Sequence, residues 1–378
     1  MAKLKKKKST GTVGKLDITF LSFVLILLTV GLVMLYSSSY AFSYNHYGNS
    51  YKFISRQAMF AAVGVVVMLI VSRIDYHIWR KFAWILYAVS TALLALLLIL
   101  PPMVEGKDVK RWFVVGPINF QPSEIAKFAV ILLFSSLIAA NYKQMKSLKF
   151  IAFLVVLLGL QCGLVVMEPH LSATVLIFAI GIVLLIVGGL PKRYILGGVG
   201  AGVGLGVLAV VTGVIGYGSD RIKYWLDPWA DAMGNGFQTI QSLLAIGSGG
   251  ILGRGIGQSR QKYLWLPEPH NDFIFAIVCE ELGLIGALVI ILLFCLLVWR
   301  GFTIAMRAKD KFGSLLAIGL TFQVGLQAML NIWVVTNTIP NTGISLPFFS
   351  YGGTSLLILL AEMGIVLSVS RGASIEKS

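Results

Sequence analysis

Long, nearly uncharged apolar runs constrain this chain more than any other feature of its sequence. A helix needs about 20 consecutive, mostly apolar residues to cross a bilayer, and about ten runs here approach that length. Only 12% of the residues are charged, against roughly 25% in soluble domains. These observations predict an all-α polytopic membrane protein. The expected spans are 18–37, 58–74, 82–100, 124–140, 150–167, 171–189, 194–214, 272–298, 313–335 and 351–369.

The distribution of Lys and Arg predicts the orientation of these spans. With the N-terminus inside, about two thirds of the 31 Lys and Arg residues fall in the inner segments, in agreement with the positive-inside rule. Both termini are therefore expected in the cytoplasm. The same bias accounts for most of the +15 net charge, so we expect no nucleic-acid partner. The expected organisation is a basic cytoplasmic tail at 1–17, a single transmembrane domain at 18–371 and a cytoplasmic tail at 372–378.

The longest outer loop, residues 215–271, connects the seventh and eighth expected spans. Its Trp225, Trp229 and Trp265 suit the headgroup level of a bilayer. The segment GFQTIQSLLAI (236–246) has apolar residues at helical spacing, which predicts an interfacial or re-entrant helix. Closely spaced glycines between 247 and 257 predict a flexible turn region after it. Because the longest and most complex loop lies on the outer face, we expect the functional site there.

Ionisable residues inside a span or at its end are costly in lipid, so each is a functional candidate. The set is Glu124, Lys127, Glu168, His170, Glu268, His270, Asp272, Glu280, Glu281 and Glu362. Structural roles remain open for them. Glu124 and Lys127 lie three residues apart and can pair on one helix face, while Asp272 can cap the helix that follows it.

Other members of this set also have structural interpretations. Both His170 and His270 can be interfacial residues. The adjacent Glu280 and Glu281 point about 100° apart on a helix, so at most one is expected to face any one site. For this glutamate pair, a structural or supporting role is the expectation.

Basic residues on the outer face need a reason, because the positive-inside rule disfavours them there. They occur in KDVKRW, with Lys107, Lys110 and Arg111, and in GQSRQK, with Arg260 and Lys262. A phosphate-bearing ligand is one explanation, since Arg binds phosphate oxygens bidentately, and scattered solvated charge is the other. No nucleotide-binding glycine motif is present, so we expect no nucleotide cofactor. Outer carboxylates and cations together favour a lipid-linked polyprenyl-phosphate substrate, for an enzyme or for a flippase.

Several ordered stretches resemble one known family over residues 15–371. They are QPSE (121–124), KRW (110–112), DPW (227–229), GFQTIQSLLAIGSGGILGRGIGQSRQK (236–262), LPEPHNDFIFAIVCEELG (266–283) and LPFFSYGGTS (346–355). Together these motifs resemble the SEDS family (shape, elongation, division and sporulation), which includes FtsW, RodA and SpoVE. GLVMLYSSS near the start and TNTIPNTGISLPFFSYGGTS near the end look more like the FtsW and SpoVE branch.

The resemblance implies a fold and an activity. Family members have about ten spans with both termini inside. They are peptidoglycan glycosyltransferases that polymerise lipid II, an undecaprenyl-pyrophosphate-linked disaccharide-pentapeptide, on the outer face of the cell membrane. The implied partners are a class B penicillin-binding protein transpeptidase and divisome proteins at the division septum. A divalent cation, Mg²⁺ or Mn²⁺, is the implied cofactor. The alternatives are a lipid II flippase, with Glu362, Lys127 and Glu280 along its path, and a non-catalytic scaffold for the transpeptidase.

The resemblance also implies roles for particular residues. The essential acid of the family aligns with Asp272, the expected general base. Glu268 and His270 are expected to tune Asp272 or to bind metal, with Asp272 and Glu268 as the candidate metal ligands. The expected substrate-binding residues are Gln121, Ser123, Glu124, Arg111, Lys127, Arg260, Lys262, Glu268, His270 and Ser350, with both lysines and both arginines expected at the pyrophosphate. Where many relatives have Gln-Pro-Asp-Leu-Gly, this chain has Glu168 to Ser172, so the carboxylate has moved by two positions.

Overall fold

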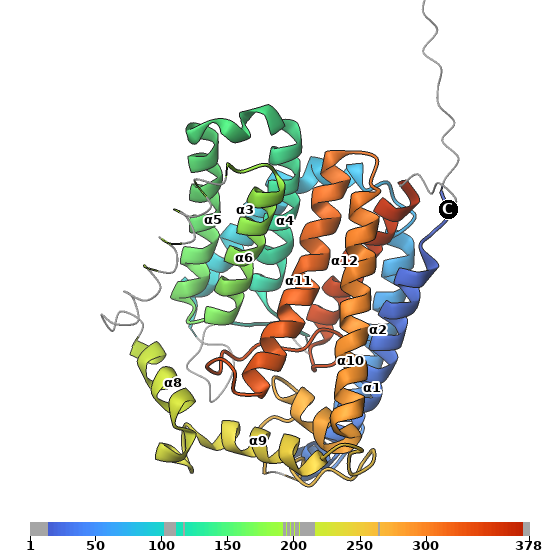
Figure 1. The fold of residues 1–378 in the computed structure, drawn as a ribbon, viewed down its shortest axis with the longest axis vertical. Helices are drawn as coiled ribbons and strands as arrows, with labels where there is room; N and C mark the ends of the chain where they lie inside the picture. The colour runs from blue at the N-terminus through green and yellow to red at the C-terminus, as the bar shows by residue number, and fades with distance from the viewer. Residues whose placement is uncertain are drawn as a thin grey trace, which may run out of the picture.

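The computed structural model describes residues 14–101, 111–115, 118–191, 194, 197, 200, 204, 216–263 and 265–372. Long helices form a bundle (Figure 1). The helices of membrane-spanning length are α1 (Ile18–Tyr47), α2 (Lys52–Val71), α3 (His77–Ile99), α4 (Pro122–Ala140), α5 (Leu148–Met167), α10 (Ile274–Met306), α11 (Lys311–Val335) and α12 (Gly353–Gly372). The other elements are β1 (Phe113–Val115), β2 (Ile118–Phe120), η1 (Tyr142–Lys146), α6 (Leu171–Val187), α8 (Gly216–Leu226), η2 (Pro228–Asp231) and α9 (Phe237–Gly249).

The all-α membrane fold is confirmed. In the described part of the chain, 8 helices are long and apolar enough to cross a membrane, and α6 is a shorter apolar helix of 17 residues. Helix α2 begins at Lys52, six residues before the expected span, because charged residues at a membrane surface still adopt helical backbone. The expected span 194–214 and the expected tails lie largely outside the described residues.

Helices α4, α11 and α12 form the centre of the bundle. In each, 61% of the most apolar window is buried, against 28% in α2, α3 and α5. Helix α11 approaches α4 closely at Gly319, where an added Cβ would lie 2.7 Å from the Ile131 side chain. Polar side chains of α4 and α11 therefore lie inside the bundle, where polar groups need partners.

Asp17, just before α1, lies close to the ends of α10 and α12 at one end of the bundle. Arg300, near the end of α10, places Nη2 2.8 Å from Oδ2 of Asp17. The backbone N–H of Asp17 donates to the hydroxyl of Ser370, in the last turn of α12, at 3.2 Å. The start of α1 and the end of α12 therefore share one side, as the expectation for the termini requires. Asp272 precedes α10, so it lies at the opposite end.

The outer loop is built into α10 rather than attached to it as a flexible turn. Gly283 interrupts α10 with φ 68° and ψ −170°. Leu284 and Ile285 donate their N–H groups to the carbonyls of Gly250 and Ile251, at 2.9 and 3.2 Å. The carbonyls that these donors would use in a regular helix, those of residues 280 and 281, instead accept from residues 254 and 255, both at 3.0 Å. The loop backbone thus replaces two helical hydrogen bonds with four of its own.

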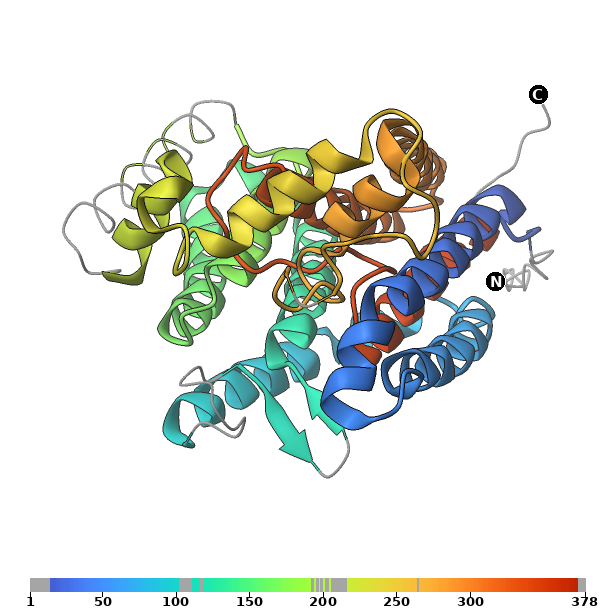
Figure 2. The same cartoon turned by 90° about the horizontal axis from the view of Figure 1, so that it is seen from below.

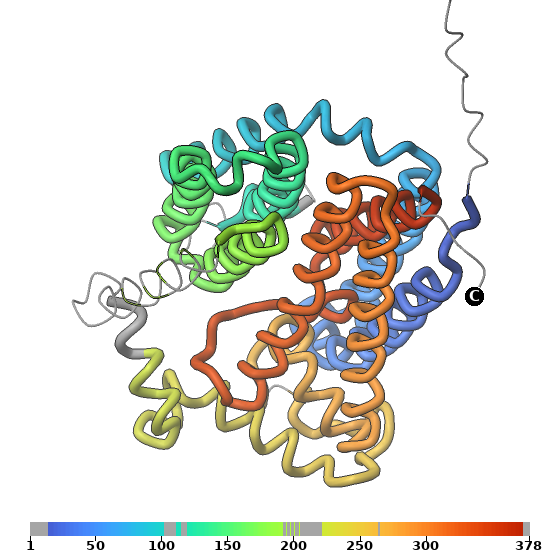
Figure 3. Tube along the Cα trace, turned by 45° about the horizontal axis from the view of Figure 1, so that its top comes forward, coloured from blue at the N-terminus to red at the C-terminus, as the bar shows by residue number. Residues whose placement is uncertain are grey.

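The same end of the bundle also carries α9 and the β1–β2 hairpin (Figure 1). Helix α9 lies across this end (Figure 2), as the spacing of its apolar residues predicted. Strands β1 and β2 pair antiparallel, with Phe113 opposite Phe120. Between α11 and α12 the chain runs without regular secondary structure from 336 to 352 and crosses the interior of the molecule (Figure 3). These segments bring residues that are distant in sequence to one place.

Candidate functional site

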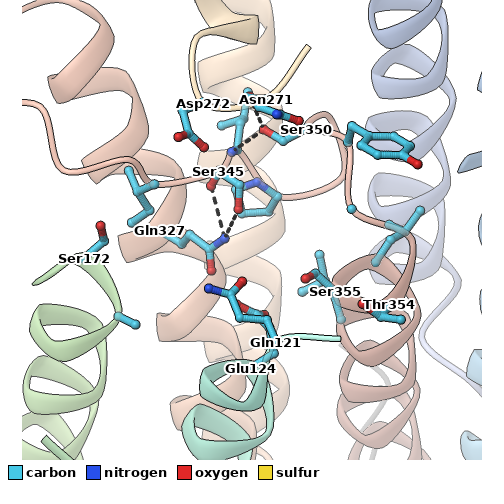
Figure 4. A pocket seen from close by; sticks show the side chains of 18 of the residues that line it. Gln121, Glu124, Ser172, Asn271, Asp272, Gln327, Ser345, Ser350, Thr354 and Ser355 are labelled. Carbon is cyan, nitrogen blue, oxygen red and sulfur yellow. Dashed lines mark hydrogen bonds between the residues drawn. The ribbon is translucent and has the colours of Figure 1, made fainter. Parts of the chain in front are cut away.

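A polar cavity of about 350 Å³ lies among α4, α6, α11, α12 and the segments around them (Figure 4). Its ionisable lining residues are Arg56, Arg111, Glu124, Lys127, His170, Glu268 and Asp272. Of the expected site residues, it gathers Gln121, Arg111, Glu124, Lys127, Glu268, Asp272 and Ser350. The cavity therefore joins the outer loop with residues of α2, α4, α6, α11 and α12 in one site.

Asp272 is half-buried and is fixed through its backbone. Its carbonyl accepts from Nδ2 of Asn331 at 2.7 Å, and the same nitrogen donates to the carbonyl of Ile344 at 2.6 Å. Helix α10 begins at Ile274 with Phe273 at the N-cap position, so Asp272 lies before the cap. Capping therefore does not account for this residue. In Figure 4 the Asp272 carboxylate faces into the cavity.

The neighbours of Asp272 are also held by specific contacts. Oε2 of Glu268 accepts from Nδ2 of Asn271 at 3.0 Å. The hydroxyl of Ser350 donates to the carbonyl of Asn271 at 2.8 Å. Glu268 adopts a left-handed φ of 45°, which is unfavourable for a residue other than glycine or asparagine. This end of the cavity is thus acidic, and its backbone is tightly defined.

Lys127 marks the deeper part of the cavity. Its Nζ lies 2.9 Å from Oε1 of Glu124 and donates to Oε1 of Gln327 at 3.0 Å. Gln327 in turn donates to the carbonyl of Ser345 at 3.1 Å. The side-by-side placement of Glu124 and Lys127 on one helix face is therefore confirmed as an ion pair. Because both side chains line the cavity, the pair also contributes to its electrostatics.

The turn between α5 and α6 forms one wall beside Arg111. The Arg111 guanidinium donates to the carbonyl of Pro169. Burial raises the pKa of Glu168 to about 8, although the charge of Arg111 opposes this shift. Burial, together with the charge of Arg111, lowers the pKa of His170 to about 3. At neutral pH both groups are therefore mostly uncharged, and only His170 lines the cavity.

Ser123 is connected to this site by its contact with His170. Nδ1 of His170 lies 3.4 Å from the hydroxyl of Ser123 and 3.4 Å from Nε2 of Gln121. Ser123 is fully buried and does not line the cavity. Its placement indicates a role in orienting the histidine ring.

Arg260 and Lys262 lie outside the cavity, in contrast to the expected contacts with pyrophosphate. Lys262 is fully buried, and its Nζ lies 2.8 Å from Oε1 of Glu281 and donates to Ser37 at 3.2 Å. Arg260 is exposed, and its backbone N–H donates to Oε1 of Glu280 at 2.9 Å. Lys262 does not line the cavity, and its charge is already paired with that of Glu281, so it does not face a substrate phosphate there.

Glu280 and Glu281 correct a second expectation. We expected at most one of them to face any one site, but both bind the turn at 259–262, which wraps around α10. Glu280 accepts from the hydroxyl of Ser259 at 2.5 Å. Glu281 accepts from Lys262 and from the backbone N–H of Ser259, the latter at 3.3 Å. The expectation of a structural role for these residues agrees with this arrangement.

His270 packs against aromatic rings rather than lining the cavity. Its ring centroid lies 4.9 Å from that of Phe42 and 4.4 Å from that of Phe53. Its carbonyl accepts from the backbone N–H of Tyr351 at 2.9 Å. His270 therefore supports the segment that carries Asp272.

Sequence reasoning missed several lining residues. Arg56 is not among the expected site residues, yet it lines the cavity from α2. Gln323 and Gln327 also line it from α11. The sequence did indicate these two glutamines, because two amides four residues apart in an apolar run lie on one helix face. Only ionisable residues had been considered in the spans.

The expected metal ligands lie at the acidic end of the cavity. Both Glu268 and Asp272 line it. Among the described residues, no cluster of three or more His, Cys, Asp or Glu side chains could hold a metal ion. Two carboxylates still fit Mg²⁺, which usually keeps several waters and takes further ligands from substrate phosphates.

Comparisons with known proteins agree over nearly the whole chain. The profile of a family described as cell cycle protein, FTSW_RODA_SPOVE, matches residues 18–375. Stage V sporulation protein E of Bacillus subtilis strain 168 is 39% identical over 94% of this chain and 97% of its own length. A probable peptidoglycan glycosyltransferase FtsW of Trichlorobacter lovleyi is 40% identical over 94% of this chain and 93% of its own length.

Solved structures give the same result. A chain from a peptidoglycan synthase complex that coordinates polymerization and crosslinking aligns with a TM-score of 0.78 and 29% identity, over 96% of this chain and 99% of that chain. Rod shape determining protein RodA of Thermus thermophilus aligns with a TM-score of 0.70 and 27% identity, over 96% of this chain and 98% of that chain.

Proposed function

Since this chain belongs to the cell cycle protein family of FtsW, RodA and SpoVE, we propose that it is a peptidoglycan glycosyltransferase that polymerises lipid II. The relatives named peptidoglycan glycosyltransferase FtsW support the enzyme class. The observation that carries the proposal is the cavity, which has carboxylates at one end and the cations Arg56, Arg111 and Lys127 around the rest of its lining.

The reaction joins two sugars. The acceptor hydroxyl of one glycan attacks the anomeric carbon of a donor sugar. A new carbon–oxygen bond forms, and the bond between the anomeric carbon and the pyrophosphate oxygen breaks. The electron pair leaves with the lipid pyrophosphate, and the proton of the hydroxyl must go to a base. Because the pyrophosphate is already an activated leaving group, the reaction needs no nucleotide.

Asp272 is the proposed base. Its carboxylate faces the cavity, and its backbone carbonyl is held by Asn331, which in turn donates to the carbonyl of Ile344. Fixed geometry matters because a base must lie within hydrogen-bond distance of the proton that it accepts. General-base catalysis of this kind typically contributes about 10²- to 10⁴-fold in rate.

The cavity cations are proposed to stabilise the departing pyrophosphate. Arg111 and Arg56 offer planar guanidinium groups that match phosphate oxygens. Lys127 contributes a third positive charge whose position Glu124 and Gln327 fix. Preorganised charge in a partly dehydrated site lowers the barrier without reorganisation during the reaction. A Mg²⁺ or Mn²⁺ ion held by Asp272 and Glu268 would add charge neutralisation at the phosphates when bound.

We further propose a cellular context. This multi-pass membrane protein would work beside a class B penicillin-binding protein and divisome proteins at the septum. The aligned chain from a peptidoglycan synthase complex supports a transpeptidase partner. On this proposal the cavity opens to the outer face, at the end of the bundle opposite the chain termini.

The decisive experiment is polymerisation of purified lipid II, with and without the cognate transpeptidase. Asp272→Asn protein that is folded and still binds its partner is expected to form no glycan chains. Normal polymerisation by that variant would falsify the assignment of the base. Movement of labelled lipid II across vesicles by wild-type protein that forms no polymer would favour a flippase instead. Normal growth of cells that carry only Asp272→Asn would favour a scaffold.

A further inference from the structure

A second open recess, of about 430 Å³, lies on the outer part of α1, away from the residues proposed to react. We call it the tyrosine recess. It is lined by Tyr40, Ala41, Tyr44, Asn45, Ser50 and Tyr263. None of these residues belongs to the cavity that contains Asp272. Its volume lies within the roughly 300–1,000 Å³ typical of small-molecule sites.

The length of α1 places this recess beyond the hydrocarbon core. Helix α1 has 30 residues and at 1.5 Å per residue is about 45 Å long, roughly 15 Å longer than a typical hydrocarbon core. Counted from Ile18, Tyr36 lies about 27 Å along the helix and Tyr44 about 39 Å. A tilt of about 20° shortens these heights by only about 6%. With the hydrocarbon core counted from Ile18, Tyr36 therefore lies near the outer edge of the core, and Tyr44 lies near the outer limit of the headgroup region.

Contacts among the lining tyrosines and a buried ion pair hold the walls of the recess in place. The hydroxyls of Tyr40 and Tyr263 are hydrogen-bonded, and their rings meet edge to face with centroids 6.0 Å apart. Nζ of Lys262 lies 4.8 Å from the centroid of the Tyr40 ring and is paired with Glu281. This buried ion pair thus fixes both the Tyr40 ring and the turn that carries Tyr263. A site with fixed walls loses less entropy when a ligand binds.

The lining of the recess matches an uncharged carbohydrate. Each tyrosine offers an apolar ring face and a hydroxyl at its tip, and Asn45 and Ser50 add further hydrogen-bonding groups. A sugar ring has the complementary pattern of C–H faces and hydroxyl edges. Among the residues that the structure describes, the recess has no charged lining residue and, apart from Ala41, no aliphatic side chain of the kind that anchors a protein partner.

Aromatic contacts connect the recess with the cavity. Phe42, next to Ala41 on α1, contacts His270 with ring centroids 4.9 Å apart. His270 contacts Tyr351 at 6.1 Å, and Tyr351 lines the cavity. One layer of rings therefore separates the two hollows. A strand made at Asp272 would pass over this layer when it leaves along the outer face.

We propose that the tyrosine recess is a product subsite that binds sugar units of the growing glycan strand. This inference rests on the proposed polymerase function. By holding the strand between successive additions, the recess would increase the number of sugars added before release. Loss of the recess is therefore expected to shorten the products more than it slows the first transfer.

The test separates strand binding from catalysis. A lipid-free tetrasaccharide of alternating N-acetylglucosamine and N-acetylmuramic acid is added to purified full-length protein in nanodiscs, and binding is measured by saturation-transfer NMR. Tyr44→Ala combined with Tyr263→Ala is expected to weaken binding by roughly tenfold or more, as loss of two ring contacts does. Asp272→Asn is expected to bind like wild type, because the subsite does not include the base.

Polymerisation supplies the second measurement. The double variant is expected to consume lipid II at an initial rate within about twofold of wild type while its mean product length falls several-fold. Trp229→Ala, which removes an aromatic side chain that is 67% exposed elsewhere in the outer loop, is the matched control and should leave product length unchanged. Tyr44→Phe with Tyr263→Phe retains the rings and should retain more binding than the alanine pair.

Unchanged tetrasaccharide binding and product length in the folded alanine variant would overturn the proposal. So would a variant that binds sugar normally but no longer binds its transpeptidase, because the recess would then be a protein interface. A polymerisation defect in Asp272→Asn without any effect of the tyrosine variants would leave the proposed function intact while rejecting the subsite.

Discussion

The buried pair of Glu281 and Lys262 gives the sharpest stability prediction. Both side chains are fully buried, and their charged atoms lie 2.8 Å apart. Glu281→Gln keeps the size of the side chain and an acceptor oxygen for Ser37. It removes the negative charge, so the ammonium of Lys262 remains in the interior without a counter-charge.

The size of the expected stability loss in Glu281→Gln follows from the burial of the ion pair. Removing one partner of a buried ion pair costs about 3–5 kcal/mol, because the remaining charge keeps its desolvation penalty. With an unfolding entropy of about 2.1 cal/mol/K per residue, that loss lowers the melting temperature of a chain this long by about 4–6 °C. The double variant Glu281→Gln with Lys262→Met leaves no unpaired charge, so it should recover most of the loss.

The assay is thermal unfolding of wild type, both single variants and the double variant in one detergent. A double-mutant cycle from these four proteins isolates the coupling between the two side chains. The reasoning is refuted if Glu281→Gln melts within about 1 °C of wild type, well below the shift that an uncompensated buried charge requires. It is also refuted if the double variant is less stable than Glu281→Gln alone.

Three further predictions concern other residues. The pKa of Glu168 is raised from 4.5 to about 8, so the folded state holds a proton that the unfolded state releases, and stability should fall as pH rises from about 4.5 to about 8. Glu168→Gln should flatten that part of the curve of melting temperature against pH, and an unchanged slope would contradict the shift. Gly283→Ala should cost more than about 2 kcal/mol in denaturant unfolding, because φ is positive and the added Cβ would lie 2.3 Å from the backbone nitrogen of Gly253. Lys127→Met should lower the rate of lipid II consumption by about 10²- to 10³-fold at unchanged folding, whereas near-normal turnover would exclude it from stabilising the leaving group.

The sequence predicted the membrane fold well because length and hydropathy alone decide whether a helix can cross a bilayer. It also predicted that Asp272, Glu124, Lys127 and Arg111 would belong to one site. Asp272 was identifiable because a carboxylate at the mouth of an apolar run is costly without a function.

The errors arose where distant segments meet. Lys262 looked like a cation free for phosphate because its carboxylate partner Glu281 lies 19 residues away inside an apolar run, and Ser37 lies 225 residues away. The glycines after 247 looked flexible, but two of them donate or accept hydrogen bonds within the break in α10. Periodicity describes one helix at a time, so it cannot reveal a loop strand that replaces hydrogen bonds in another element.

The break at Gly283 divides α10 into two mechanical parts. The short outer part, from Ile274, follows directly after Asp272, and its carbonyls at 280 and 281 accept from residues 254 and 255, whereas residues 284 and 285 below the break donate to residues 250 and 251. The long part below the break is anchored through Arg300 to the start of α1. Because residues 250–255 bond to both sides of Gly283, a displacement of this loop would change the angle between the two parts of α10 and with it the position of the proposed base.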